Sequence, residues 1–210
     1  MKKMSKNLKN KLKRNYIYDF DLSYDQKALF EEVKNTKISP FFSDNPNKDS
    51  WFCAPSTWLR GEIKNLDTPE MKSIINQLNK LTNAKDIRPV FVFQEKGTSV
   101  PSHLDLIKGK VINKCSVNIQ LKEKVGPVSF GWVDADDLTV KSLYVDKDGN
   151  SRYEHDGPIH TYYCALLNTQ KMHGVPAFDD EDRVFVKFNI YDVSYEDALN
   201  NYLKNKNAVI

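Results

Sequence analysis

The pentapeptide P-S-H-L-D at residues 101–105 places two potential metal ligands on one short extended segment. His103 and Asp105 are two residues apart, so on a strand both side chains leave the same face and can converge on one ion. A second stretch, M-H-G-V at residues 172–175, supplies His173 as a third ligand. Together the two stretches predict one metal site built from distant parts of the chain.

Two imidazoles and one carboxylate on one face of an octahedron, with the other positions open, form the ligand set of non-haem Fe(II) sites. With Fe(II) bound, neutral imidazoles and one carboxylate leave one net positive charge. Ten residues after His173, Arg183 opens the strand-like run R-V-F-V-K-F-N-I. A guanidinium entering a buried strand needs an anionic partner. The acids at residues 179–182 are one candidate, and a bound carboxylate held bidentately is the other.

Strand patterns dominate the chain from residue 88 onward. Val, Phe and Ile are dense or alternate with polar residues there, and Gly-containing turns separate the runs. The predicted strands cover residues 90–93, 111–121, 128–132, 138–145, 159–167 and 183–191. The acidic, Gly-containing residues 146–150 predict a hairpin turn between two strands. Their spacing does not match a calcium-binding loop.

The first part of the chain predicts helices. A short strand at 16–22 precedes a helix that Ser23 caps and that ends near residue 33, while residues 36–61 are irregular. A second helix, with Thr68 as its N-cap and one apolar stripe, runs over residues 68–81.

The order of these elements predicts a fold that is mainly β with flanking helices, a double-stranded β-helix of the jelly-roll type. In such a fold His103, Asp105 and His173 meet at the mouth of the barrel. We expect one domain over residues 16–210, with a helical and irregular part, a β core and a C-terminal helix. These parts cover residues 16–87, 88–193 and 194–204, and a basic arm covers residues 1–15.

The charge of the chain is concentrated at its N-terminus. The formal net charge is +3, but residues 1–14 hold seven basic residues and no acid, and the remainder has four more acids than bases. The arm is expected to be solvated, with nucleic-acid binding as an alternative. Three well-separated cysteines, no signal peptide and no transmembrane run predict a cytoplasmic protein.

Polar positions near the proposed site have two interpretations. Ser116, Asn118 and Gln120 share one face of a strand, which either lines a wet, charged interior or faces solvent. A rival ligand set, His155, Asp156 and His160, lies in a Gly- and Pro-containing loop that no arginine-bearing strand follows, so we expect an exposed turn there.

The order H-x-D, a distal His and an Arg ten residues later resembles the Fe(II)/2-oxoglutarate-dependent dioxygenase superfamily, whose members have a double-stranded β-helix fold. The segments G-T-S-V-P-S-H-L-D, S-V-N-I-Q-L, H-G-V and R-V-F-V-K-F-N-I-Y-D are most similar to its aspartyl/asparaginyl β-hydroxylase-like branch. The resemblance covers residues 88–193.

The resemblance implies that His103, Asp105 and His173 bind Fe(II) and that Arg183 pairs with the distal carboxylate of 2-oxoglutarate. Asn118 stands where the branch has a further contact to this cosubstrate, and Lys187 is a second candidate anion partner. The implied reaction uses O2 to hydroxylate a C–H bond of an amino-acid-like or peptidyl substrate, with release of succinate and CO2. The alternatives are a non-catalytic jelly-roll binding module and a nucleic-acid-binding protein that uses the basic arm.

Overall fold

The computed structural model describes most of the chain beyond its basic arm. The described residues are 16–36, 38–40, 58–63, 66–94, 96–97, 100–103, 105–107, 110–111, 113–122, 126–130, 144–145, 151–152, 159–171, 173–175 and 182–206. The predicted arm at 1–15, most of the predicted strand at 138–145, and the His155-Asp156 part of the rival ligand set lie outside them.

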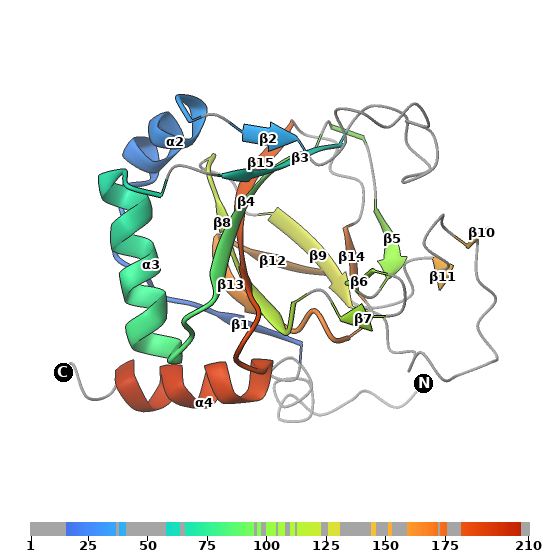
Figure 1. Ribbon diagram of the computed structural model, residues 1–210. Helices are drawn as coiled ribbons and strands as arrows, with labels where there is room; N and C mark the ends of the chain where they lie inside the picture. Colours follow the sequence, from blue (N-terminus) through green and yellow to red (C-terminus); the bar gives the residue numbers. More distant parts are fainter. Residues whose placement is uncertain are drawn as a thin grey trace.

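Two antiparallel sheets face each other among the described residues (Figure 1). The larger has seven strands in the order β1 (Ile17–Asp19), β13 (Cys164–Leu167), β8 (Cys115–Gln120), β15 (Arg183–Ile190), β4 (Ile87–Gln94), β3 (Trp58–Ile63) and β2 (Ile38–Pro40). The smaller has the order β12 (Ile159–Tyr162), β9 (Gly126–Phe130), β14 (His173–Val175) and β5 (Val100–His103). Two short hairpins add β6 (Leu106–Ile107) with β7 (Lys110–Val111), and β10 (Tyr144–Val145) with β11 (Ser151–Arg152).

The path of the chain between the sheets defines the fold. From β4 it crosses to β5, returns to β8, crosses to β9 and β12, returns to β13, crosses to β14 and ends in β15. Four strands of each sheet thus form an eight-stranded double-stranded β-helix, the jelly-roll arrangement. The predicted fold class is confirmed.

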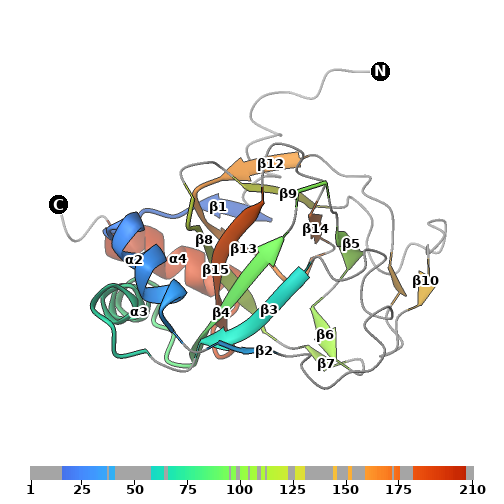
Figure 2. The same ribbon diagram turned by 90° about the horizontal axis from the view of Figure 1, so that it is seen from above.

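Helices cover the outer face of the larger sheet. Figures 1 and 2 show α2 (Gln26–Lys34), α3 (Pro69–Thr82) and α4 (Tyr195–Lys206) on the side of this sheet away from β5, β9 and β14. Alternate residues of β15 contact this layer: Val184, Val186, Phe188 and Ile190 belong to the same buried cluster as the inner faces of the helices. None of the helices in the described part of the chain is long and apolar enough to cross a membrane.

Two helix starts differ from the sequence-based prediction in their capping groups. Asp25, not Ser23, caps α2, and its Oδ1 accepts hydrogen bonds from the amides of Lys27 and Ala28 at 2.9 and 3.0 Å. Thr68 does stand at the N-cap of α3, but its side chain makes no capping bond. The carboxylate of Glu32, from α2, accepts the first free amides of α3 instead, so one helix caps the next.

Two strand predictions also need correction. The run at 159–167 is two strands, because a bend at Tyr163 moves the chain from the smaller sheet into the larger one. Residues 36–61, predicted to be irregular, contain β2 and the start of β3, which extend the larger sheet beyond β4. The predicted hairpin around residues 146–150 is confirmed by the pairing of β10 with β11.

Leu78 tests whether α3 is anchored by its apolar face. This side chain is fully buried between α3 and the larger sheet, so Leu78→Ala should lower the free energy of unfolding by about 2 to 5 kcal/mol. Urea unfolding measures the change. The control Lys80→Ala, on the exposed face of the same helix, should stay within about 0.5 kcal/mol of the wild type. Equal effects of the two substitutions would contradict this packing.

Candidate metal centre

The two histidines of the candidate site lie directly opposite each other on neighbouring strands. β5 and β14 pair in antiparallel fashion with His103 in register with His173. Side chains at such positions project to the same face of the sheet. The two ring centroids are 4.7 Å apart.

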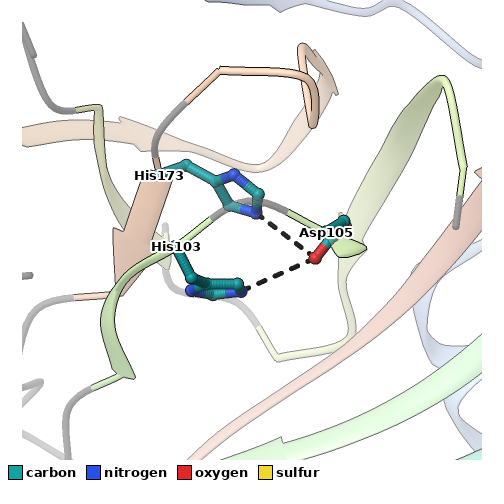
Figure 3. A group of neighbouring side chains, drawn as sticks. All are labelled: His103, Asp105 and His173. Carbon is teal, nitrogen blue, oxygen red and sulfur yellow. Dashed lines mark ion pairs between the residues drawn. The ribbon is translucent and has the colours of Figure 1, made fainter. Parts of the chain in front are cut away.

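Asp105 completes the cluster from just beyond the end of β5. Its Oδ1 lies 3.5 Å from Nε2 of His103 and 3.7 Å from Nε2 of His173, and Figure 3 shows both imidazoles pointing toward this oxygen. One ligand atom from each of the three residues lies within 4.8 Å of the others. The structure therefore brings together the three residues that the sequence analysis singled out.

The spacing fits a single divalent ion. Ligands about 2.1 Å from an octahedral ion lie about 3 Å apart when they occupy one face. The separations from Oδ1 of Asp105 are 3.5 and 3.7 Å, and all three ligand atoms lie within 4.8 Å of one another, so the side chains would move closer together to bind one ion. Two nitrogens and one oxygen suit Fe(II) and similar transition metals.

His173 is prepared to act as a ligand through Nε2. Its Nδ1 donates to the carbonyl oxygen of Lys171 at 2.9 Å, which leaves the Nε2 lone pair directed at Asp105. Burial lowers the pKa of His173 to about 3, although the carboxylate of Asp105 opposes the shift. The Nε2 lone pair of a neutral imidazole thus faces a carboxylate oxygen. A cation between these two electron-rich atoms would stabilise the arrangement.

Lys187 bonds to the other oxygen of Asp105. Its Nζ lies 2.6 Å from Oδ2, and both side chains are nearly buried. Burial alone would raise the pKa of Asp105, but the ammonium of Lys187, with smaller contributions from His103 and His173, holds it well below the usual range. From the sequence, Lys187 is a candidate partner only for a bound anion, and its contact with the predicted ligand Asp105 was not foreseen.

Arg183 lies on the same face of β15 as Lys187 and is buried. Its Nε donates to Oε1 of Gln120 at 3.1 Å, and its Nη2 donates to the hydroxyl of Tyr162 at 2.6 Å. Of the acids considered as its partners, residues 179–181 lie outside the described chain. The carboxylate of Asp182 accepts a hydrogen bond from the amide of Lys96.

Tyr162 is a site residue that the sequence analysis missed. Its hydroxyl accepts hydrogen bonds from Arg183 and, at 3.1 Å, from Nδ2 of Asn118. Both lone pairs of this oxygen are then used, so its own proton is left to donate toward the cavity that it lines. A tyrosine within a strand is common in cores, and only the pairing of the strands shows which groups its hydroxyl meets.

The polar face of β8 is buried. Ser116, Asn118 and Gln120 are each at most 5% exposed, so the solvent-facing interpretation is wrong. Asn118 lines the cavity, and its Oδ1 accepts a hydrogen bond from Ser116. Nε2 of Gln120 has no hydrogen-bond partner among the described residues, which leaves a buried donor beside Arg183.

A cavity of about 50 Å³ lies between the two sheets. Its lining includes all five predicted site residues, His103, Asp105, Asn118, His173 and Arg183, together with Tyr162 and Lys187. His160, the described member of the rival ligand set, stands on β12 and is not among its lining residues.

No protein-family model matches this chain, and no curated protein matches its sequence. Among solved structures, it is similar to a Pseudomonas putida prolyl-4-hydroxylase, with 12% identity, a TM-score of 0.46, and coverage of 83% of this chain and 91% of the other. For the viral collagen prolyl hydroxylase of Paramecium Bursaria Chlorella virus-1, in complex with 2OG, the values are 8%, 0.48, 83% and 95%. For HygX from Streptomyces hygroscopicus, with nickel, 2-oxoglutarate and hygromycin B bound, they are 10%, 0.47, 91% and 90%.

The lowered pKa of His173 predicts a loss of stability in mild acid. Below pH 6.5 the unfolded chain takes up a proton at this residue that the native protein does not, so stability falls with pH by up to about 1.4 kcal/mol per unit. Urea unfolding of the chelator-treated protein at pH 7.5 and 5.0 measures this, and His173→Gln should show a smaller difference than the wild type. The control His160→Gln, which leaves His173 in place, should keep the wild-type difference. Identical pH dependence in His173→Gln and the wild type would contradict the prediction.

Proposed function

We propose that the chain is a non-haem Fe(II)- and 2-oxoglutarate-dependent dioxygenase that hydroxylates a C–H bond of an amino-acid-like or peptidyl substrate. The observation that carries the proposal is the convergence of His103, Asp105 and His173, in which the Nε2 lone pair of a neutral His173 faces a carboxylate oxygen. The proposed metal ligands are these three side chains.

A cluster of hydrogen-bond donors supports a carboxylate as the second ligand of the cavity. Arg183 contributes a buried positive charge, and Tyr162 contributes an O–H group whose oxygen already accepts two hydrogen bonds. Burial lowers the pKa of Arg183, so its charge is held at a cost that a carboxylate offsets. We assign the distal carboxylate of 2-oxoglutarate to this end of the cavity, with Asn118 holding the hydroxyl of Tyr162.

This geometry indicates what the protein contributes to the reaction and what the bound metal and cosubstrates contribute. Bound Fe(II), 2-oxoglutarate and O2 supply the oxidation, which yields succinate, CO2 and a hydroxylated product. His103, Asp105 and His173 would hold the metal from one side, and a ligand set of this kind would leave room on the metal for the keto acid and O2. Arg183 and Tyr162 fix the far end of the keto acid and so determine which of its oxygens reach the metal. The burial of His173 and Asp105 keeps water away from the reacting groups.

The substrate class rests on the resemblance of residues 88–193 to the aspartyl/asparaginyl β-hydroxylase-like branch. The carboxylate of Asp105 fills the third protein position on the metal, which supports hydroxylation as the outcome.

One observation favours a second candidate function. The ammonium of Lys187 already neutralises Asp105, so the cavity can remain assembled around a bound dicarboxylate without metal. In that case the chain is a jelly-roll binding module. The two candidates differ in turnover, because a binding module forms no succinate.

Succinate formation tests the proposed reaction. The purified protein with Fe(II), ascorbate, O2 and 2-oxoglutarate should release succinate, with slow turnover even without the substrate. His103→Ala and His173→Ala should each lower the rate at least about a hundredfold, since each removes one of three ligands. The control His160→Ala should retain the wild-type rate. Absence of succinate together with metal-independent binding of 2-oxoglutarate would favour the binding module.

Arg183 should determine the affinity for the distal carboxylate. Loss of a charge-assisted bidentate contact in Arg183→Leu should raise the Kd for 2-oxoglutarate by about 10- to 100-fold, and Tyr162→Phe should raise it less. Calorimetry on the Mn(II) complex measures binding without turnover. The matched ligand is 2-oxopentanoate, which has the same five-carbon chain with a methyl group in place of the distal carboxylate. Its Kd should be unchanged in Arg183→Leu. Equal losses for both ligands would show that Arg183 does not contact this carboxylate.

A further inference from the structure

We propose that Lys187 is the resident counter-cation of the metal centre, which neutralises Asp105 when no metal is bound and makes the metal-loaded cavity selective for a dianion. The inference rests on the proposed function, because it assigns Lys187 a role toward the proposed metal and keto acid. Lys187 is a positioning residue here, since it acts through Asp105 and through its charge.

The two oxygens of the Asp105 carboxylate have different partners. Oδ2 of Asp105 lies 2.6 Å from Nζ of Lys187, whereas Oδ1 faces the imidazoles of His103 and His173 at 3.5 and 3.7 Å. A carboxylate held in this way offers one oxygen to a metal and keeps the other on the ammonium. The contact also spans the barrel, because Lys187 stands on β15 of the larger sheet and Asp105 follows β5 of the smaller one.

Burial explains why such a cation is needed. The side chains of Asp105 and Lys187 are 6% and 11% exposed, so each charge has lost most of its water. A buried carboxylate without a partner is strongly destabilising, whereas a paired one with good hydrogen-bond geometry is tolerated. Lys187 therefore keeps the three ligands assembled in the metal-free protein.

The same ammonium opposes the metal. Lys187 bonds to the same carboxylate that would bind the metal. Two positive charges beside one buried carboxylate repel each other. Lys187 thus weakens metal binding relative to a site in which Asp105 has no other partner. A neutral side chain at position 187 removes this repulsion and leaves a buried carboxylate that only the metal can neutralise.

For an anion the effect has the opposite sign. A divalent metal, one carboxylate and two neutral imidazoles leave one positive charge, the guanidinium of Arg183 adds a second, and the ammonium of Lys187 adds a third. The charge of Lys187 attracts both carboxylates of a dicarboxylate such as 2-oxoglutarate, but only one group of a monocarboxylate. Removal of Lys187 should therefore strengthen metal binding and weaken dianion binding, and a purely structural residue has no reason to shift the two in opposite directions.

The experiment compares the full-length wild type with Lys187→Met by calorimetry under conditions without turnover. Mn(II) is titrated first, and 2-oxoglutarate is then titrated into the Mn(II) complex. We expect Lys187→Met to bind Mn(II) at least about tenfold more tightly and 2-oxoglutarate at least about tenfold more weakly than the wild type. Lys187→Arg keeps the charge and should stay within about threefold of the wild type in both titrations. Lys72→Met, which removes an exposed lysine of α3 paired with Asp67, is the control and should change neither.

The results of these titrations test the role of Lys187 separately from the proposed function. Affinities that change in the same direction, or do not change, overturn the role of Lys187 while leaving the proposed function intact. A wild type that binds no Mn(II) overturns both proposals, whereas opposite shifts in a protein that forms no succinate support this inference and refute catalysis. Thermal unfolding without metal checks the fold of each variant. If Lys187→Met does not fold, Lys187→Gln, which still donates a hydrogen bond to Oδ2 but carries no charge, is held to the same expectation.

Discussion

The alternation of side chains along β8 and β15 is the constraint on which the rest of the structure depends. Each strand is buried on both faces, yet the two faces differ in chemistry. Val184, Val186 and Phe188 pack against the helical layer, while Arg183 and Lys187 line the cavity from the other face. The outer apolar face supplies the burial that stabilises the sheet, and this stability supports charged groups on the inner face, which are costly to desolvate.

The candidate site joins the two sheets through polar contacts. The smaller sheet contributes His103 and His173 as a pair in register, and Asp105 follows from the end of the same strand as His103. The larger sheet contributes Lys187, which bonds to Asp105, and Arg183, which bonds to Tyr162 on the smaller sheet. These two contacts cross the interior of the barrel, so the relative position of the sheets and the geometry of the cavity depend on each other.

The sequence could predict whatever depends on local spacing. The H-x-D spacing, the distal histidine, the alternating run of β15 and the apolar stripe of α3 each follow from short-range periodicity, and together they predicted the fold class and the residues that converge. Contacts between distant segments could not be predicted in this way. The capping of α3 by Glu32, the bend at Tyr163 and the pairing of Lys187 with Asp105 all depend on how the elements pack. Tyr162 was missed for the same reason, because only strand pairing places its hydroxyl between Arg183 and Asn118.

His103, Asp105 and His173 are proposed to hold one divalent ion beside an anion-binding pocket. The most direct measurement is a crystal structure of the protein with Mn(II) and 2-oxoglutarate, using anomalous scattering at a wavelength that identifies the metal. We expect one anomalous peak about 2.1 Å from Nε2 of both histidines and Oδ1 of Asp105, with the distal carboxylate against Arg183 and Tyr162. A metal bound elsewhere, or no metal between these three side chains at saturating Mn(II), would contradict it.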